Sequence, residues 1–383
     1  MEVVKQFDKF QLTRSVRKEC IAVAMSGGVD SSMAAVILKE EGYEVIGLTM
    51  DLGNPVSSKE SPSSGEKVPS GNLGDARRVA EQIGISHTTI DLREEFEQNV
   101  VQYFVSEYMK GRTPNPCIRC NERIKFRFLL EKAQSLGARA LATGHYARIK
   151  NFSGEKQGTP TPYLLLRGKD RKKDQSYFLF SLRQEQLSRI IFPLGERTKE
   201  EVRAEARKRR LRVAERAESQ EICFIPENDY RRFLENRMGK KFSQPGPIVN
   251  RERKVLGFHR GLHSFTIGQR RGLRIAAPHP LYVLALEPEE NRVVAGSKEE
   301  LSARGLVAHD VHWIAFPNLA ETIEVLVQIR YRHPEIPAVL SPLGGEKIRV
   351  EFGRPQKSIT PGQAAVFYRG DEVLGGGWIE KAL

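Results

Sequence analysis

A glycine- and serine-rich loop between a short apolar strand and a helix constrains the fold of this chain more than any other feature. Residues 21–25 form an apolar run of strand length, and Ser26-Gly27-Gly28-Val29-Asp30-Ser31-Ser32 follows it directly. Apolar residues at helical spacing continue over residues 33–41 and stop at Gly42, and residues 44–50 form a second strand-like run. This β–loop–α–β order predicts the opening of a parallel sheet with nucleotide chemistry at its strand ends.

The composition of the loop predicts that it binds phosphate. Its two adjacent glycines let the backbone approach a phosphate closely, and the N-terminus of the following helix supplies free N–H donors and partial positive charge. Ser26, Ser31 and Ser32 add hydroxyl donors. The loop lacks the Gly-Lys-Ser/Thr ending of a Walker A motif, so γ-phosphate transfer is not indicated. Asp30 either helps to place Mg²⁺ on a pyrophosphate or caps the helix.

The rest of the chain divides by its pattern into an α/β part and a β-rich part. Strand–helix alternation continues to about residue 210, with helices expected at residues 75–83, 94–110 and 121–136 and strands at residues 86–91 and 138–143. A stretch rich in Ser, Pro and Gly at residues 53–71 predicts a mobile surface insertion. From residue 229 Gly, Pro and Arg become frequent, and short alternating runs from residue 281 predict a small all-β module.

The charge of the chain favours a polyanionic partner. The 383 residues carry a formal net charge of +13, and such an excess strengthens binding to nucleic acid through counterion release. Basic clusters at residues 167–173, 207–210 and 270–271 are candidate phosphate contacts. No run of eighteen apolar residues predicts a membrane span, and residues 1–20 have no apolar core of a signal peptide, so we expect a cytoplasmic protein without a membrane partner.

Four cysteines remain to be explained: Cys20, Cys117, Cys120 and Cys223. In a reducing compartment they argue against a disulfide framework and favour catalysis, metal binding or burial. Cys20 precedes the apolar strand and is expected to be a small buried hydrophobe. Cys117 and Cys120 stand at the expected N-terminus of a helix, which predicts lowered thiol pKa values. A zinc site is the alternative, but a second Cys-x-x-Cys is missing.

Together, these motifs resemble a known family, the tRNA-specific 2-thiouridylases, which are N-type ATP pyrophosphatases of the PP-loop superfamily. The resemblance extends from the phosphate loop to residues 265–269 and 361–363 and covers nearly the whole chain. The matching segments, in the family's order, are residues 25–32, 111–116, 120–121, 142–146, 173–179 and 218–224. It implies an α/β fold in three domains. These are a parallel-sheet PP-loop ATPase domain of the adenine nucleotide alpha hydrolase type (residues 1–225), a small central tRNA-binding domain (226–295) and a C-terminal β-barrel (296–383).

The resemblance also implies a reaction. ATP, with Mg²⁺, would adenylate the C2 oxygen of the wobble uridine in the tRNA anticodon stem-loop, with release of pyrophosphate. Sulfur supplied by a donor relay protein would then displace AMP and give 2-thiouridine. Cys120 corresponds to the nucleophile and Cys223 to the persulfide carrier of the family.

Two further sets of residues carry over by position. The ATP-contacting positions are Ala24, Met25, Ser26, Gly27, Gly28, Val29, Asp30, Ser31, Met50 and Gly144. The tRNA-contacting positions are Asn115, Pro116, Cys117, His145, Lys173, Asp174, Gln175, Arg330, Tyr331 and Gln363.

One departure from the family pattern leaves the sulfur chemistry open. Many members carry an aspartate, a proposed acid/base, where this chain has Cys117. A thiol can also shuttle a proton, but Cys117, Cys120 and Cys223 could instead hold a [4Fe–4S] cluster with one open iron. Two other functions compete with thiolation: a PP-loop amide synthetase or ligase, and a non-catalytic tRNA-binding sulfur carrier. The paired cysteine motifs disfavour the first, and the intact loop disfavours the second.

Overall fold

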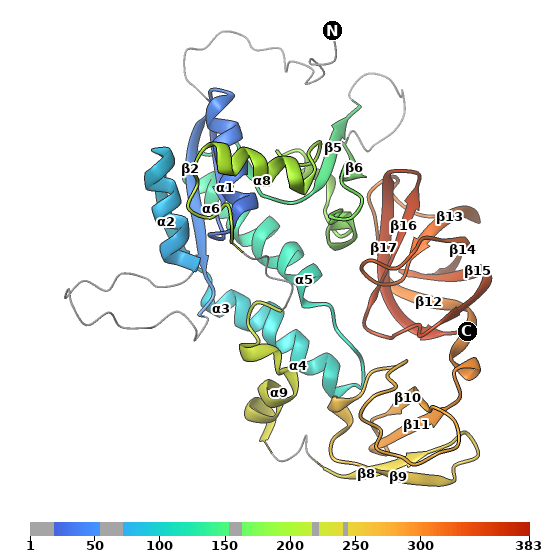
Figure 1. The fold of residues 1–383 in the computed structure, drawn as a ribbon. Coiled ribbons are helices and arrows are strands. Elements are labelled where there is room, and N and C mark those ends of the chain that lie inside the picture. Colours follow the sequence, from blue (N-terminus) through green and yellow to red (C-terminus); the bar gives the residue numbers. More distant parts are fainter. Residues whose placement is uncertain (1–18, 54–71, 153–162, 217–221, 240–243) are drawn as a thin grey trace, which may run out of the picture.

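The computed structural model describes residues 19–53, 72–152, 163–216, 222–239 and 244–383 (Figure 1). The expected insertion at residues 53–71 lies outside this part of the chain except for Gly53, and so do residues 218–221 of the Cys223 motif. Three bodies are visible: a sheet covered by helices, a β-barrel, and a smaller β module beside the barrel. Within the described residues, no helix is both long and apolar enough to cross a membrane.

The N-terminal body is built on a parallel sheet, as the sequence predicts. Its five strands lie in the order β3-β2-β1-β4-β7. Their bounds are β1 (Cys20–Ala24), β2 (Glu44–Asp51), β3 (Ser86–Asp91), β4 (Ala140–Ala142) and β7 (Ile190–Ile191). The apolar strand β1 is central because alternate residues face two cores. Ile21 and Val23 pack on one side, and Ala22 packs on the other.

Helices cover both faces of this sheet. Core residues of α1 (Val29–Glu40), α2 (Asn72–Ile83) and α8 (Lys199–Lys208) pack with Ile21 and Val23. The opposite core receives two longer helices, each with a π-helical section. The first runs through α3 (Arg93–Phe96), η2 (Glu97–Val101) and α4 (Gln102–Met109). The second runs through α5 (Pro116–Arg119), η3 (Cys120–Leu129) and α6 (Leu130–Ser135).

The second long helix starts five residues earlier than the sequence pattern indicated. The Asn115 side chain accepts a hydrogen bond from the Ile118 N–H at 3.4 Å, and Pro116 occupies the first helical position. Both residues are typical of a helix start, the first as a cap and the second because its φ angle is already helical. Cys117 and Cys120 therefore lie within the helix and not ahead of it.

The expectation of uninterrupted strand–helix alternation to residue 210 is wrong at one place. Strands β5 (Ala147–Asn151) and β6 (Tyr163–Arg167) pair antiparallel and leave the N-terminal sheet. Strand β6 joins the C-terminal sheet through the pairing of Leu166 with Glu372 of β17 (Glu372–Ala382). The N-terminal part thus contributes a hairpin to the sheet of the C-terminal part.

The last third of the chain forms two β bodies and not one module. The central sheet has the order β10-β11-β8-β9, and the short helix η7 (Leu262–Ser264) of this module contacts helix α9 (Tyr230–Met238). Its strands are β8 (Gly246–Val249), β9 (Val255–His259), β10 (Tyr282–Glu287) and β11 (Arg292–Gly296). The C-terminal strands β12-β15-β14-β13-β16-β17 close into a six-stranded barrel because β12 also pairs with β17. Their bounds are β12 (Ser302–Trp313), β13 (Ile323–Gln328), β14 (Ile336–Gly344), β15 (Lys347–Lys357) and β16 (Ala364–Arg369), followed by β17.

The barrel and the N-terminal body share one hydrophobic core. Trp378 and Tyr368 of the barrel belong to the same buried cluster as Tyr177 and Phe180. The Tyr177 hydroxyl donates to the Ala364 carbonyl at 3.0 Å. A boundary at residue 296 therefore separates chain segments but not cores.

Candidate functional site

The predicted phosphate loop is folded into a tight turn by its own polar groups. The Ser26 N–H donates to Ser31 Oγ at 3.1 Å, and the Ser31 and Ser32 hydroxyls donate to the Gly28 carbonyl at 3.2 and 2.8 Å. Gly27 has a φ of 71°, which favours glycine. The loop conformation is thus held by the residues that the sequence marked for phosphate binding.

Residue 144 closes over this loop from a neighbouring strand. Strands β2 and β4 flank β1 in parallel, so Met50, Gly144 and the loop all lie at the carboxyl ends of adjacent strands. A Cβ on Gly144 would lie 2.7 Å from both the Asp30 carbonyl carbon and the Ser31 nitrogen. The fold therefore brings the three separated segments predicted to contact ATP to one sheet edge.

Asp30 has partners that the sequence did not reveal. Lys199 Nζ donates to both carboxylate oxygens, at 2.8 and 2.7 Å, and the Tyr146 hydroxyl donates to Oδ1 at 2.8 Å. The alternative role of helix cap is wrong, because Gly28 holds that position and Asp30 makes no capping bond. Lys199 lies about 170 residues further along the chain, so only the tertiary fold could show the contact.

The described side chains do not form a preorganised metal-binding site. No group of three or more His, Cys, Asp or Glu residues within the part of the chain that the structure describes is placed to hold a metal ion. Both oxygens of Asp30 accept from Lys199, so its surroundings do not make a preformed Mg²⁺ site. Mg²⁺ would therefore reach this site bound to ATP, as part of the substrate. The three downstream cysteines likewise do not form the ligand set of a [4Fe–4S] cluster.

The three cysteines nevertheless lie near one another. Cys117 and Cys223 reach the surface and Cys120 is half-buried. The charge of Cys120 acts on both other thiols, and that of Cys117 also acts on Cys223. The helix therefore brings Cys117 and Cys120 together with a thiol that follows them by about a hundred residues.

The prediction of lowered thiol pKa values is wrong. Protein atoms crowded around the thiols raise the pKa of Cys117 to about 11 and of Cys223 to about 12, and burial raises the pKa of Cys120. The direction of all three pKa shifts is opposite to the one that a helix N-terminus would give, so crowding by protein atoms outweighs that field.

Lys125 is the cation of this thiol cluster. Its ammonium donates to Asn121 Oδ1 at 2.9 Å, and the Asn121 amide in turn donates to the Phe178 carbonyl at 3.1 Å. It lies in the π-helical section η3, in which residues five apart, such as Cys120 and Lys125, follow one another along the same side. Its charge lowers the pKa of each of the three thiols, against the larger effect of burial. Sequence reasoning missed it because α-helical spacing does not predict this neighbour.

We expect Lys125→Met to slow alkylation of the cluster thiols by iodoacetamide. Removing the ammonium raises their pKa values further, so the reactive thiolate becomes scarcer by roughly three- to tenfold at a given pH. In the unchanged protein the rates should climb about tenfold per pH unit between pH 7 and 10, because the pKa values of Cys117 and Cys223 lie above that range. Peptide mass spectrometry reads each cysteine separately. Lys132→Met, one turn beyond the π-helical section, is the control, and equal slowing by both variants would contradict the assignment.

The loop ahead of Cys117 is fixed by both β bodies. The Thr113 N–H donates to the Pro361 carbonyl at 2.9 Å, and Gln363 Nε2 donates to the Thr113 and Pro114 carbonyls at 2.8 and 3.3 Å. From the central module, the Thr266 hydroxyl contacts that of Thr113 at 3.3 Å. Gln363, predicted to contact tRNA, thus uses its amide to hold the loop that carries the predicted Asn115–Cys117 contacts.

Other predicted tRNA contacts differ in their accessibility. Asp174 is buried and accepts from Arg167, from the Gly168 N–H and from Ser176, so it shapes its loop. His145 is buried, and its Nδ1 lies 2.7 Å from the Thr143 hydroxyl oxygen. Burial lowers the pKa of the His145 ring. Gln175 Oε1 accepts from the Tyr146 N–H at 3.0 Å. Arg330 is exposed, and Lys173 and Tyr331 are partly exposed, so these three remain available to a partner.

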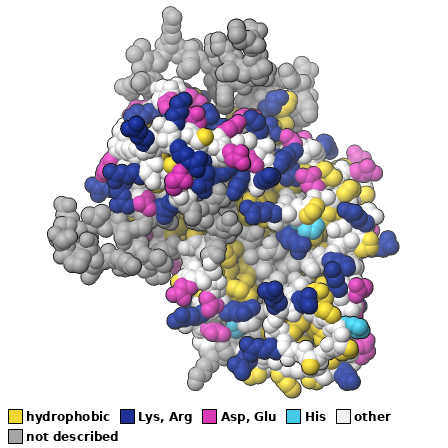
Figure 2. Space-filling view, in the orientation of Figure 1, with side chains coloured by type: hydrophobic (Ala, Val, Ile, Leu, Met, Phe, Trp, Pro, Cys, Tyr) yellow, Lys and Arg dark blue, Asp and Glu magenta, His cyan; other side chains and the backbone are white. Residues whose placement is uncertain are grey.

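Basic residues are spread over the molecule and are densest in the central module. Figure 2 shows Lys and Arg side chains on all three bodies, more numerous than acidic ones on this face. Residues 231–297 contain 13 Lys and Arg against 5 Asp and Glu, which is 8 of the net charge of +13. A hollow of about 430 Å³ there is lined by Arg270, Arg274 and His279 among others. This module therefore carries most of the charge that favours a polyanion.

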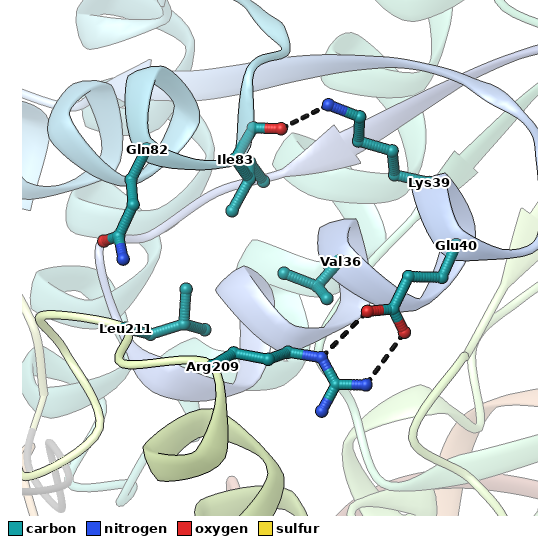
Figure 3. A pocket seen from close by; sticks show the side chains of 7 residues that line it. All are labelled: Val36, Lys39, Glu40, Gln82, Ile83, Arg209 and Leu211. Carbon is teal, nitrogen blue, oxygen red and sulfur yellow. Dashed lines mark hydrogen bonds and ion pairs between the residues drawn. The ribbon is translucent and has the colours of Figure 1, made fainter.

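A second hollow, of about 370 Å³, lies at the opposite end of α1 from the phosphate loop (Figure 3). Its charged groups already have partners. Arg209 binds Glu40 through two contacts of 2.9 Å, and Lys39 donates to the Gly84 carbonyl at 2.9 Å. We therefore do not assign a ligand to it.

Three family models match consecutive parts of this chain. Residues 19–227 match the model described as tRNA methyl transferase HUP domain, residues 231–297 the tRNA methyl transferase PRC-barrel domain, and residues 303–379 the aminomethyltransferase beta-barrel domain. Fold and models together define a nucleotide-binding, tRNA-modifying type of enzyme.

Similar proteins narrow the class to a family. The chain is 54% identical to the tRNA-specific 2-thiouridylase MnmA of Geobacter metallireducens, over 97% of this chain and 99% of that one. It is 50% identical to that of Geotalea uraniireducens and 49% identical to that of Carboxydothermus hydrogenoformans, over 97% and 96% of this chain and 98% and 99% of theirs. The chain belongs to the tRNA-specific 2-thiouridylase family, which confirms the resemblance seen in its motifs. A likeness to NMN synthetase from Francisella tularensis, with a TM-score of 0.33 over 59% of this chain and 79% of that one, is too weak to support an argument.

Proposed function

We propose that the protein is an ATP-dependent tRNA-uridine 2-sulfurtransferase that makes 2-thiouridine at the wobble position. One observation supports this most: residues 144 and 145 connect the phosphate loop to the thiol cluster. Gly144 packs against Asp30 and Ser31. The centre of the His145 ring lies 5.8 Å from the centre of the Phe126 ring, and Phe126 follows Lys125 in the chain. Lys125 acts electrostatically on His145 and on all three cysteines. A base held between these elements would face both an activating nucleotide and sulfur.

The first chemical step would activate the uridine. The C2 oxygen attacks the α-phosphorus of ATP, the bond from that phosphorus to the bridging oxygen breaks, and pyrophosphate leaves with the electron pair. Oxygen on C2 is a poor leaving group, whereas AMP is a good one. The loop N–H groups at the start of α1 would hold the phosphates. Ala24 to Ser31, Met50 and Gly144 are the proposed ATP contacts.

The second step would exchange oxygen for sulfur. A persulfide on Cys223 attacks C2 and AMP departs, which leaves the base joined to Cys223 through a disulfide. The Cys120 thiolate then attacks Cys223 Sγ, a Cys120–Cys223 disulfide forms, and the sulfur stays on C2. A two-electron thiol reductant restores both thiols. We propose the persulfide route and derive no step through an iron–sulfur cluster.

The three domains would have different roles, which we infer from their charge and from the residues that they expose. Residues 1–225 would carry out the chemistry, while the basic central domain (226–295) and the barrel (296–383) would bind tRNA through phosphate contacts. The wobble base must leave its stack to enter such a site. Arg330, Tyr331 and Lys173 are the most accessible of the proposed contacts. A tRNA substrate implies action in the cytoplasm, with a persulfide-carrying relay protein as sulfur donor.

The test is tRNA-dependent exchange of labelled pyrophosphate into ATP, measured beside 2-thiouridine formation. Gly27→Val should abolish exchange, because valine strongly disfavours a φ of 71° and would block phosphate approach. Gly353→Ala, in barrel strand β15, is the control. Its added Cβ would meet only the Pro337 carbonyl oxygen, at 3.7 Å, so exchange should stay within about threefold of the unchanged protein.

The same assay separates the competing functions. A ligase would exchange pyrophosphate with another acceptor and without tRNA, and a sulfur carrier would not exchange it at all. Full exchange by a folded Gly27→Val variant would overturn the assignment of the loop.

A further inference from the structure

Lys199 is a buried cation placed against the phosphate loop. Its side chain is 8% exposed, and its ammonium contacts both oxygens of Asp30, the second residue of α1. The Tyr146 hydroxyl shares Asp30 Oδ1, and the Lys199 ammonium lies 6.0 Å from the centre of the Tyr146 ring. The contact therefore brings a lysine from the start of α8 to the start of α1.

A purely structural role does not explain a lysine at this position. Lys199 is the first residue of α8, after the cap Thr198. Its charge therefore lies at the positive N-terminus of α8 and beside the positive N-terminus of α1. Helix N-termini favour anions and disfavour an ammonium there. Burying a lysine also costs hydration free energy, which the partly exposed carboxylate of Asp30 offsets only in part. Two helix N-termini and a cation together suit a ligand with more negative charge than Asp30.

The loop itself provides no such cation. Residues 26–32 contain no Lys or Arg, whereas a Walker A loop carries a lysine for the phosphates. Among the described residues Arg216 also contacts the loop, but it donates to the Gly27 carbonyl at 2.7 Å and to the Asp75 carboxylate at 2.5 Å. Of the described residues, Lys199 is thus an ammonium that the fold places at the N-terminus of α1.

We propose that Lys199 binds the phosphates of ATP and stays on the pyrophosphate as it leaves, with Asp30 and Tyr146 as positioning residues. The inference rests on the proposed ATP-dependent function. When the bond between the α-phosphorus and the bridging oxygen breaks, the new charge falls on the pyrophosphate, and an ammonium in place stabilises it without a proton transfer. Asp30 holds the lysine chain so that a short rotation brings Nζ onto a phosphate oxygen.

Isothermal titration calorimetry with inorganic pyrophosphate, ATP and adenosine tests this. Lys199→Gln keeps a donor for Asp30 but removes the charge, and Lys199→Ala removes both. Both variants should bind pyrophosphate and ATP about 10- to 100-fold more weakly, the range for a lost charge-assisted hydrogen bond. Adenosine affinity should be unchanged, because adenosine has no phosphate. Lys199→Arg should recover part of the loss.

Lys132→Ala is the matched control. That lysine is exposed on α6 and belongs to none of the proposed contacts, so its removal changes the net charge equally but should weaken binding less than threefold. Unchanged pyrophosphate affinity in a folded Lys199→Gln protein would overturn the proposal and leave the ion pair structural. An unchanged protein that binds neither ATP nor pyrophosphate would instead overturn the proposed function, and this inference with it.

Discussion

Cys120→Ser is expected to abolish 2-thiouridine formation while leaving tRNA-dependent adenylation intact. A serine hydroxyl cannot attack the persulfide-derived disulfide, so the last step stops, whereas the phosphate loop is untouched. The loss in single-turnover thiolation should be on the order of a thousandfold or more, as for removal of a nucleophile. Pyrophosphate exchange should stay within about threefold of the unchanged protein. The modified nucleoside is quantified by mass spectrometry of digested tRNA.

Two other cysteine variants sharpen this result. Cys223→Ser should stop thiolation to the same extent, because the persulfide has no carrier. Cys20→Ser is the control, since Cys20 opens β1 at the end opposite the phosphate loop. Thiolation at the unchanged rate by the Cys120→Ser protein would refute the persulfide route.

Cys117 distinguishes that route from a cluster. If sulfur travels by persulfide, Cys117→Asp restores the commoner family pattern and should keep much of the activity in air. Cys117→Ala should reduce the rate without any change in bound iron. Iron and sulfide that co-purify anaerobically, and are lost with activity in Cys117→Ala, would favour the cluster instead.

Deleting residues 296–383 is expected to unfold the N-terminal body and not merely to weaken tRNA binding. Trp378 and Tyr368 would be removed from the core that holds Tyr177 and Phe180. Arg119, in the helix that carries Cys117 and Cys120, would lose its contact with the Trp378 ring, whose centre lies 4.7 Å from the guanidinium. The core that the barrel shares with the N-terminal body is the reason for this expectation.

Trp378→Ala gives the same test at one position. Truncating this buried ring should lower the free energy of unfolding by about 3–5 kcal/mol, which denaturant titration measures. Leu343→Ala, at an exposed barrel position, should change it by less than about 0.5 kcal/mol. A truncated protein that melts cooperatively and binds ATP normally would show the domains to be independent.

The parts that the sequence predicted are those encoded by neighbouring residues. Met50 and Gly144 were named as neighbours of the loop only through the family resemblance, whereas the parallel sheet and the phosphate turn follow from strand–loop–helix order alone. The partners of Asp30 do not, because Lys199 and Tyr146 reach Asp30 from distant segments, and no sequence motif surrounds Lys199. The β5–β6 hairpin was missed for a similar reason: its pairing partner lies about two hundred residues later.

The thiol pKa values were predicted wrongly because two local rules conflict. A helix start lowers a thiol pKa and burial raises it, and the balance depends on atoms packed from elsewhere in the fold. Likewise, the π-helical section that aligns Lys125 with Cys120 has no signature in the local pattern. Sequence reasoning named the thiols that are proposed to react, and the structure supplied the charges around them.

The shared core also means that the N-terminal body cannot complete its folding until the barrel has been synthesised. Tyr177 and Phe180 leave the ribosome about two hundred residues before Trp378, which at about 5–20 residues per second is a delay of roughly 10–40 s. During that interval Tyr177, Phe180 and the other apolar residues that pack with the barrel would be uncovered, and the β5–β6 hairpin would have an unpaired edge. We expect the growing chain to depend on holding chaperones until its last strand emerges, and a stop codon late in the message to yield aggregates and not a partly active enzyme.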